Sequence, residues 1–270
     1  MVSYKALMVI PLALLIGSIA ILVAGYAQTG EWFQRSIDLK GGTLITLPEA
    51  DLAAVEAALP DARVRSIGGF GGQAVLAELE GDPAAALAAL KAAGIETGDA
   101  SVQTIGSSLG ENFWVQAQIG IVAAFVLMGI VVFFLFRKVV PAIAVLFAAI
   151  TDIVVTLAMM QVFSIQLSLA GLGAILMIIG YSVDTDILTA SRVLKEEEGQ
   201  TKEKIWGAVK TGLTMTLTTI GALAAVIIAG VSAVITQIAT ILLIGLLVDL
   251  ITTWLMNAGM IRWYEERRGH

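Results

Sequence analysis

Hydrophobic residues form six long runs, and most of the charged residues lie between them. The runs cover Ala6–Gly25, Phe113–Phe136, Val139–Phe163, Leu167–Leu188 and, approximately, Thr211–Ala229 and Val231–Met256. Each is long enough for a helix that crosses a hydrocarbon core of about 30 Å. Short polar turns separate the second run from the third, the third from the fourth and the fifth from the sixth. The pattern predicts a polytopic α-helical membrane protein with six transmembrane helices, most of them in tight antiparallel hairpins.

The first run has two interpretations. Lys5 precedes it, and Gly25-Tyr26-Ala27 has small residues at the spacing of a signal-peptide cleavage site. The apolar part of a signal peptide has about 7–15 residues, which is shorter than this run. We therefore expect residues 1–26 to form an uncleaved first helix, with a cleaved signal peptide as the alternative.

Residues 27–112 have the composition of a globular domain. We expect strands at 41–47, 63–67, 73–79 and 100–105, and helices at 49–59 and 83–93. This β-α-β-β-α-β order predicts a small ferredoxin-like α+β domain between the first two helices. The glycine-rich stretch 68–72 is expected to be a hairpin connection. It does not fit a phosphate-binding loop, because no Lys, Ser or Thr follows at the required spacing and no helix begins there.

Composition supports the membrane class and narrows the chemistry. Hydrophobic residues make up 58% of the chain and charged residues 14%, and the mean hydropathy is +0.90. There is no cysteine, and the lone histidine, His270, is the last residue. Zinc and haem sites normally need such side chains. We expect no metal, no cofactor, no enzymatic activity and no nucleic-acid partner.

Charge is divided unevenly along the chain. Residues 27–112 contain five basic and twelve acidic residues, whereas the other segments outside the apolar runs contain eleven basic and six acidic ones. Six spans place all of those other segments, from Lys5 to the tail Arg262–Arg268, on one side. The positive-inside rule then predicts that both termini are cytoplasmic and that residues 27–112 are extracytoplasmic. Within residues 113–270, the linker Arg192–Lys210 is expected to form a solvated amphipathic helix.

Four aspartates interrupt the apolar runs. Asp152 lies in the third run, Asp184 and Asp186 lie near the end of the fourth, and Asp249 lies in the sixth. A charge in hydrocarbon costs at least a few kcal/mol, so such residues are candidates for function. Asp184 and Asp186 are about 200° apart around a helix. We therefore expect one of them to face the bundle and the other to face a different partner or cytoplasmic water.

Four motifs follow one another in the order of a known family. Asp38-Leu39-Lys40-Gly41-Gly42-Thr43 follows the first span, and Gln103–Gly110, which contains Gly106 and Gly110, precedes the second. Gly180-Tyr181-Ser182-Val183-Asp184, with Arg192, lies in the fourth, and Thr216-Leu217-Thr218-Thr219 lies in the fifth. Together they resemble the SecD/SecF family of protein-export membrane proteins.

Within this family, the single small external domain resembles the SecF members, since SecD members carry a much larger one. The Asp184-Thr185-Asp186 pattern is similar to the archaeal type. The resemblance implies one half of a resistance-nodulation-division-type bundle whose other half is SecD. It further implies an accessory role in protein translocation across the cell membrane, driven by a proton or sodium gradient. The Sec translocation channel, the translocating polypeptide and the lipid bilayer would be its other partners.

Burial disfavours the charged form of a carboxyl group, so an aspartate inside a bundle can take up and release a proton. We expect a proton relay at Asp184, with Gly180 one turn earlier admitting a neighbouring helix. Asp186 has two interpretations: a proton relay, or a side chain solvated at the membrane interface. Asp152 is expected to be functional or a polar clamp between helices, and Asp249 a hydrogen-bonded structural acid.

Threonines are frequent in the fifth run. Thr214 and Thr218 lie four apart on one face and are candidate partners for an aspartate of the fourth helix. The alternative is that their hydroxyls bond to their own helix. Bacterial relatives carry an arginine near the position of Thr211, whereas the nearest cation in this run is Lys210. A directly transferred Asp–Arg coupling is therefore in doubt.

The motif residues Asp38, Lys40, Gly41, Gly42 and Thr43 are expected to be structural. The glycines suit tight backbone geometry between the first helix and the first strand. Contact with an emerging polypeptide is the alternative.

Two other functions remain open. The same helical half could form a stand-alone exporter of lipids or small molecules, for which we would expect a large apolar pocket in the external domain. A polypeptide-binding domain should instead carry a polar groove. In a third interpretation the protein is a passive assembly scaffold whose aspartates are merely hydrogen-bonded.

Overall fold

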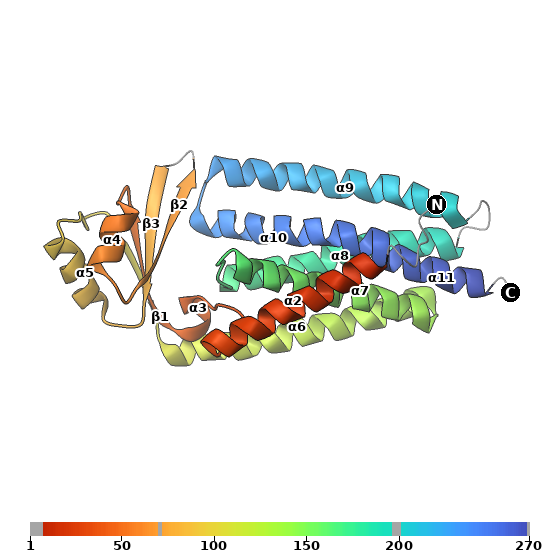
Figure 1. Ribbon diagram of the computed structural model, residues 1–270, viewed down its shortest axis with the longest axis horizontal. Helices are drawn as coiled ribbons and strands as arrows, with labels where there is room; N and C mark the ends of the chain where they lie inside the picture. Colours follow the sequence, from red (N-terminus) through yellow and green to blue (C-terminus); the bar gives the residue numbers. More distant parts are fainter. Residues whose placement is uncertain (1–7, 70–71, 196–200, 269–270) are drawn as a thin grey trace.

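The computed structural model describes residues 8–69, 72–195 and 201–268. The helices form an elongated bundle, and a small α+β domain lies at one end of it (Figure 1). The described parts of both chain ends lie toward the opposite end of the bundle. The domain between the first two long helices therefore projects from one side of the bundle only.

Six helices in the described residues are long and apolar enough to cross a membrane, as the hydrophobic pattern predicts. They are α2 (Val9–Thr29), α6 (Ser107–Phe136), α7 (Val139–Val162), α8 (Leu169–Lys195), α9 (Thr201–Ala229) and α10 (Ala233–Ile251), the last of which continues through a π-helix, η1 (Thr252–Asn257), into α11 (Ala258–Arg268).

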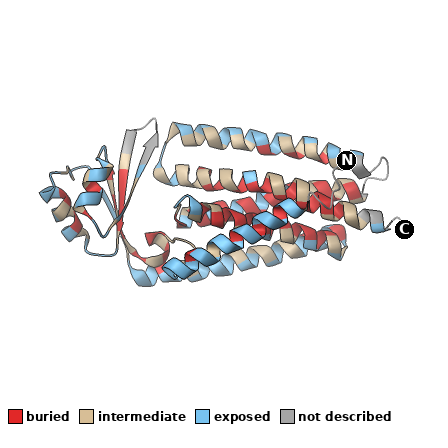
Figure 2. Cartoon of the chain, viewed as in Figure 1, coloured by how far each residue is buried: buried red, intermediate tan, exposed pale blue. Residues whose placement is uncertain are grey.

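The centre of the bundle is formed by α7, α8 and α10. A larger share of their residues is buried than in α2, α6 and α9, which expose much of their surface (Figure 2). Buried side chains such as Val145, Ile175, Ile178 and Ile241 form the core between the central helices. Any polar group on these three helices that faces inward is therefore shielded from both water and lipid.

The charged linker between the fourth and fifth spans differs from the prediction. Its first residues continue α8 to Lys195, and its last residues begin α9 at Thr201. The predicted separate amphipathic helix over 192–210 is therefore wrong, because the two transmembrane helices extend beyond the apolar runs. Glu196-Glu197-Glu198 lie outside the described residues.

The domain between α2 and α6 has the predicted β-α-β-β-α-β order. Its elements are β1 (Gly42–Pro48), α4 (Leu52–Ala58), β2 (Arg63–Gly69), β3 (Gly72–Leu79), α5 (Pro83–Ala92) and β4 (Ser101–Ile105). The strands form one antiparallel sheet in the order β2-β3-β1-β4, and Ile45, Leu47, Val55 and Leu90 are buried in its core. The helix predicted from Glu49 begins only at Leu52, because Glu49 has a positive φ of 55°. Gly69 pairs with Gly72, consistent with the predicted hairpin, while Phe70 and Gly71 lie outside the described residues.

A short helix, α3 (Ile37–Lys40), connects the first transmembrane helix to the sheet. The Ser36 hydroxyl accepts a hydrogen bond from the Asp38 backbone N–H and caps this helix. No pattern in the sequence predicts α3. With one turn, it is too short to give a hydrophobic period.

Candidate functional site

Three aspartates from different helices are buried together at the centre of the bundle. They are Asp152 on α7, Asp186 on α8 and Asp249 on α10, and each is at most 1% exposed. Buried carboxyl groups are costly unless hydrogen bonds compensate them. The local hydroxyl and amide groups supply those bonds.

Asp152 is bound by hydroxyls from two other helices. Ser182 of α8 donates to Asp152 Oδ2 at 2.6 Å. Thr252 of η1 donates to Asp152 Oδ1. Asp152 is thus a polar clamp between α7, α8 and the α10 end, as one of its two interpretations predicts.

Asp186 is bound from η1 alone. Thr253 Oγ1 lies 2.9 Å from Asp186 Oδ1, and Asn257 Nδ2 donates to the same oxygen at 2.6 Å. Within the part of the chain that the structure describes, Asp186 Oδ2 and Asn257 Oδ1 are buried without a hydrogen-bond partner. The interfacial solvation considered for Asp186 is wrong, because its side chain is fully buried.

Asp249 joins the other two carboxyls. Thr253 Oγ1 lies 2.9 Å from Asp249 Oδ1, and Thr185 Oγ1 lies 3.4 Å from Asp249 Oδ2. Thr253 therefore contacts Asp186 and Asp249 at the same time. The prediction that Asp249 is hydrogen-bonded is confirmed, although its place beside the other carboxyls was not foreseen.

The π-helix explains how one helix reaches two partners. Thr252, Thr253 and Asn257 are all fully buried residues of η1. Thr252 reaches Asp152 on α7, while Thr253 and Asn257 reach Asp186 on α8. A π-turn is wider than an α-turn, and such turns are frequent at functional sites. The polar residues Asp249, Thr252, Thr253 and Asn257 recur at helical spacing in an apolar run, and that pattern could have indicated this face from sequence.

Asp184 faces away from this cluster. Its side chain is exposed, and within the described residues no hydrogen bond or ion pair of Asp184 is recorded. Gly180 is exposed as well, and a Cβ atom added there would meet nothing within 4 Å. Among the described residues no helix of this chain packs against Gly180, so its expected role of admitting a neighbouring helix stays a prediction. Of the two fourth-helix aspartates, Asp186 is the one inside the bundle.

The hydroxyls of the fifth span do not reach an aspartate. Thr214 donates to the Lys210 carbonyl and Thr218 to the Thr214 and Met215 carbonyls, within α9 itself. Both side chains are exposed, so the predicted pairing with a fourth-helix aspartate is wrong and the alternative holds. Their face of α9 is turned outward.

Arg192 connects two of the long helices. Its Nη2 donates to Thr211 Oγ1 at 3.0 Å and connects α8 to α9. Lys210 is exposed. Thr211 therefore accepts a hydrogen bond from a guanidinium group that comes from α8.

Two of the sequence motifs meet at the junction between bundle and domain. A Cβ atom at Gly110 would lie 2.5 Å from the Gly41 nitrogen, and one at Gly41 would lie 2.5 Å from Ser107 Cα. Gly41 and Gly42 have positive φ values of 86° and 136°, which glycine adopts readily. The expected structural role of these glycines is supported by this close backbone packing of α3 on α6.

The other motif residues connect the domain to the starts of the central helices. Asp38 Oδ2 accepts a hydrogen bond from the Leu169 N–H at the start of α8. Lys40 pairs with Glu80, and Thr43 donates to the Gly81 carbonyl. Gly106 precedes α6 as its N-cap residue.

Backbone hydrogen bonds add to this connection. Ser36 N–H donates to the Leu167 carbonyl at 2.9 Å, and Leu167 N–H donates to the Gln34 carbonyl at 2.7 Å. Gln237 of α10 donates to the Gln166 carbonyl and accepts from Ser168 Oγ. The segment before α8 is thus hydrogen-bonded to both the domain linker and α10.

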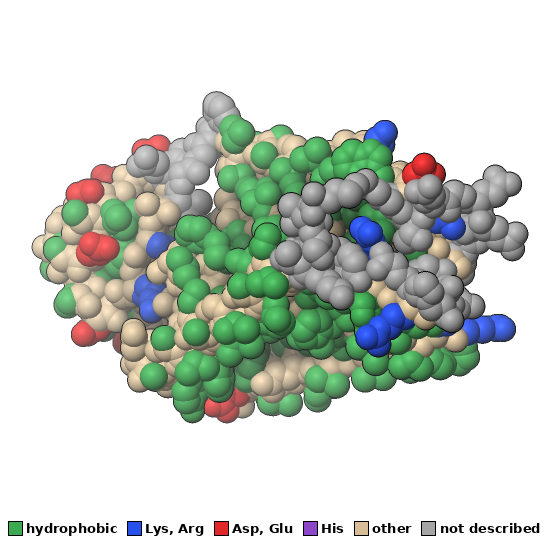
Figure 3. All heavy atoms as spheres, turned by 45° about the vertical axis from the view of Figure 1, so that its right-hand side comes forward, with side chains coloured by type: hydrophobic (Ala, Val, Ile, Leu, Met, Phe, Trp, Pro, Cys, Tyr) green, Lys and Arg blue, Asp and Glu red, His purple; other side chains and the backbone are tan. Residues whose placement is uncertain are grey.

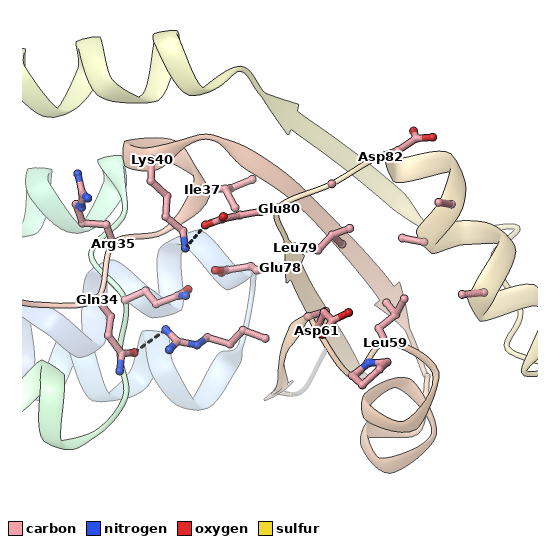
Figure 4. Close-up of a pocket in the computed structure, with 18 of the residues that line it drawn as sticks. Gln34, Arg35, Ile37, Lys40, Leu59, Asp61, Glu78, Leu79, Glu80 and Asp82 are labelled. Atoms are coloured by element: carbon pink, nitrogen blue, oxygen red, sulfur yellow. Dashed lines mark hydrogen bonds and ion pairs between the residues drawn. The ribbon is translucent and has the colours of Figure 1, made fainter. Parts of the chain in front are cut away.

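A cavity of about 660 Å³ lies between the domain and this junction. Figure 4 shows Arg35, Lys40, Glu78, Glu80, Asp61 and Asp82 around it. Dashed lines mark the Lys40–Glu80 ion pair and the hydrogen bond from Arg63 to Gln34. The lining therefore carries charges of both signs beside apolar side chains.

These features define a class. Six membrane-length helices, a small antiparallel sheet domain after the first helix and carboxyls buried at the bundle centre are typical of one half of a resistance-nodulation-division-type membrane protein. A crystal structure of SecDF from Thermus thermophilus has this fold, with a TM-score of 0.78 at 18% identity. The match covers 98% of this chain and 38% of that one, so the chain spans about two-fifths of its length. A heavy metal efflux pump is similar over 74% of this chain, with a TM-score of 0.52 at 16% identity.

Sequence comparison gives the family. The profile of the family described as protein export membrane protein SecD/SecF, C-terminal, matches residues 86–267. The protein-export membrane protein SecF of Pyrococcus furiosus is 37% identical, with 98% of this chain and 92% of the relative covered. That of Methanothermobacter thermautotrophicus is 39% identical over 98% of this chain and 94% of the relative. The chain belongs to the SecD/SecF family of protein-export membrane proteins, and its similarity is to the archaeal SecF members, as its motifs predict.

Proposed function

We propose that the chain is an accessory subunit of the Sec protein-export machinery. It acts with SecD, at the Sec translocation channel, and couples an ion gradient to the movement of a translocating polypeptide. The observation that carries this proposal is the cluster of Asp152, Asp186 and Asp249, which three helices bury at the centre of the membrane bundle.

The cluster has the chemistry that coupling requires. No ion pair recorded among the described residues neutralises these carboxyls, since the pairs recorded there lie in the external domain and its linker. Gaining or losing a proton would therefore change the net charge of a buried site. One unit charge that crosses the membrane field gains about 2.3 kcal/mol per 100 mV. This is enough to bias two arrangements of the central helices.

The junction provides a path from this site to the external domain. Asp186 and Asp249 lie on α8 and α10. The external end of α8 is hydrogen-bonded to the domain linker through Leu167 and Asp38, and Gln237 connects α10 to the same segment. A shift of α8 against α10 would thus be transmitted to the domain.

Asp184 supports a partner within the membrane. It shares an exposed face of α8 with Gly173, Leu176, Gly180 and Tyr181. An aspartate exposed to lipid is costly, and glycines on such a face allow another helix to approach closely. We assign this face to SecD. In this proposal Asp184, predicted to be a relay, contacts the partner, and Asp186 and Asp152 belong to the ion site.

The external cavity supports a polypeptide rather than a lipid. Its charged lining can hydrogen-bond to a peptide backbone and to polar side chains, which a lipid or small-molecule exporter does not need. This observation favours the Sec role over the stand-alone exporter.

Charge supports the orientation. Basic side chains gather at the end of the bundle away from the domain, and acidic ones gather on the domain (Figure 3). By the positive-inside rule, both termini are cytoplasmic and the domain is extracytoplasmic in the cell membrane. In this arrangement α2 is the membrane anchor. The domain predicted at 27–112 lies between the helix ends at Thr29 and Ser107.

Asp186→Asn tests the coupling. The amide keeps the shape of the side chain but cannot bind and release the proton, so gradient-stimulated export should fall to the level without a gradient. The measurement is export into vesicles that contain SecD and this chain, with and without a gradient. Asp51→Asn, an exposed change in the external domain, is the matched control. Unchanged stimulation with Asp186→Asn would favour the scaffold.

Co-purification tests the partner. In mild detergent the chain should bring down SecD, and Asp184→Leu should weaken this association while the chain stays monodisperse. Isolation as a homo-oligomer without SecD would favour the stand-alone exporter.

A further inference from the structure

The Thr253 hydroxyl lies between two carboxyl groups. Its oxygen is 2.9 Å from Asp186 Oδ1 and 2.9 Å from Asp249 Oδ1. A threonine hydroxyl has one hydrogen to donate and lone pairs that accept. It can therefore donate to only one of these oxygens at a time. The other short contact is a hydrogen bond only when that carboxyl itself carries a proton and donates it to Thr253.

The surrounding donors do not remove this requirement. Thr185 Oγ1, the second neighbour of Asp249, lies 3.4 Å from the carboxyl but 2.9 Å from the Ser182 carbonyl. Its single hydrogen is thus better placed for its own helix. Ser182 and Thr252 both donate to Asp152. Both short contacts of Thr253 are therefore hydrogen bonds only when the pair Asp186 and Asp249 holds a proton.

Asn257 provides an independent indication. Its Nδ2 donates to Asp186 Oδ1, while its own Oδ1 and the second oxygen of Asp186 are both fully buried acceptors without a partner. A buried acceptor without a partner is rare and costly. A proton on Asp186 Oδ2 would turn that oxygen into a donor, at a site where two buried acceptors lack one. The two unpaired acceptors therefore favour an additional proton at this site.

We propose that Asp186, Thr253 and Asp249 form a shared-proton site in which Asp249 is a second exchangeable carboxyl and Thr253 is the group that passes the proton. This inference deepens the proposed ion coupling and rests on it for the role of the site in export. It gives Asp249 a part that its sequence position did not suggest.

The transfer is balanced within the three side chains. When Asp249 Oδ1 holds the proton, it donates to Thr253, and Thr253 donates to Asp186 Oδ1. The Asp249 O–H bond breaks as a new O–H bond forms at Thr253, and the original Thr253 hydrogen passes to Asp186. The result is a protonated Asp186 and an ionised Asp249. A half-turn of the Asp186 carboxyl group about its Cβ–Cγ bond would then bring the protonated oxygen to the position of Oδ2.

The charged groups around the site limit what else could titrate there. On α7 the facing group is Asp152, and on α8 and α10 they are Asp186 and Asp249 themselves. Asp184 faces outward, and Arg192 is bound to Thr211. The helices α8 and α10 thus contribute the two members of the pair. The helix α7 contributes Asp152, which accepts hydrogen bonds from Ser182 and Thr252.

Infrared spectroscopy tests the shared proton directly. The purified chain in lipid nanodiscs should show a carboxylic-acid C=O stretching band near neutral pH that shifts in D₂O. This band should be lost in the double variant Asp186→Asn/Asp249→Asn. Thr253→Val should shift it, because the proton loses its oxygen partner, and Thr253→Ser should restore the wild-type position. Thr218→Val, which removes an exposed hydroxyl bonded to its own helix, should leave the band unchanged.

The proposal is overturned if the band persists in the double variant, or if Thr253→Val leaves it in place. Should Thr253→Val fail to fold, Asp249→Asn, which keeps the side-chain shape, must shift the remaining Asp186 band for the proposal to stand. These spectra need no translocation substrate. If the variants abolish export coupling but leave the spectrum unchanged, the shared-proton site is wrong. If they change the spectrum but leave export coupling unchanged, the proposed function is wrong.

Discussion

Two glycines from separate motifs determine how closely the junction packs. Gly110 of α6 leaves no room for a side chain, because a Cβ atom there would lie 2.5 Å from the Gly41 nitrogen and 2.9 Å from the Lys40 carbonyl carbon. These neighbours are backbone atoms, so they cannot yield by changing rotamer. The close contact is thus a property of individual residues.

Gly110→Ala should lower the free energy of unfolding by about 1–3 kcal/mol, the usual cost of an overpacked site. Thermal unfolding of the purified chain measures it. Gly106→Ala is the matched control, since a Cβ atom there meets nothing within 4 Å. Equal stability of the two variants would mean that α3 and α6 are not held together as described.

At this scale the residue pattern indicates candidates rather than contacts. The apolar runs made Asp152, Asp186 and Asp249 conspicuous, because carboxyls in hydrocarbon are rare. Which of Asp184 and Asp186 faces inward depends on the rotation of α8, and helix periodicity gives their separation but not that rotation. The orphaned oxygen of Asn257 and the position of Thr253 arise from tertiary packing alone.

Among the elements, α9 is attached to the bundle by fewer buried side chains than α7 or α8, and one specific bond helps to hold it. Arg192 of α8 donates to Thr211 at 3.0 Å, and its Nη1 would lie 2.8 Å from a Cβ atom at Gly207. The guanidinium group thus lies against the α9 backbone where that helix lacks a side chain.

A double-mutant cycle of Arg192→Met and Thr211→Val should give a coupling energy of about 1 kcal/mol, the usual size for a hydrogen bond of this kind. Unfolding of both single variants and the double variant measures it. The pair Arg192→Met and Thr214→Val serves as control, because Thr214 bonds to its own helix. A coupling indistinguishable from this control would exclude a direct bond.

The elements themselves were largely predictable. Length and hydropathy gave all six spans, and turn residues gave the order of the sheet domain. The ends of the helices were less predictable. The helices α8 and α9 continue into the charged linker, and α6 begins at Ser107 rather than Phe113. Polar residues at helix ends are compatible with a helix that extends past the hydrocarbon, so composition alone does not mark these limits.

For the whole molecule, the uneven charge leads to a prediction about topology. The chain has no cysteine, so single cysteines can be introduced on a clean background. Asp99→Cys, in the external domain, should react with a membrane-impermeant maleimide in intact cells. Arg137→Cys, exposed between α6 and α7, should react only after the membrane is permeabilised. Reversed labelling would contradict the orientation.

The π-helix has a consequence for relatives of the protein. A π-turn closes its hydrogen bonds over five residues rather than four, so η1 holds more chain in the same length than an α-helix would. A relative whose last helix is regular throughout should therefore need a one-residue gap against positions 252–257 when its two ends are kept in register. Where that gap falls, the hydroxyl that spans two carboxyls should be missing, and such a protein would have to carry its proton by another route.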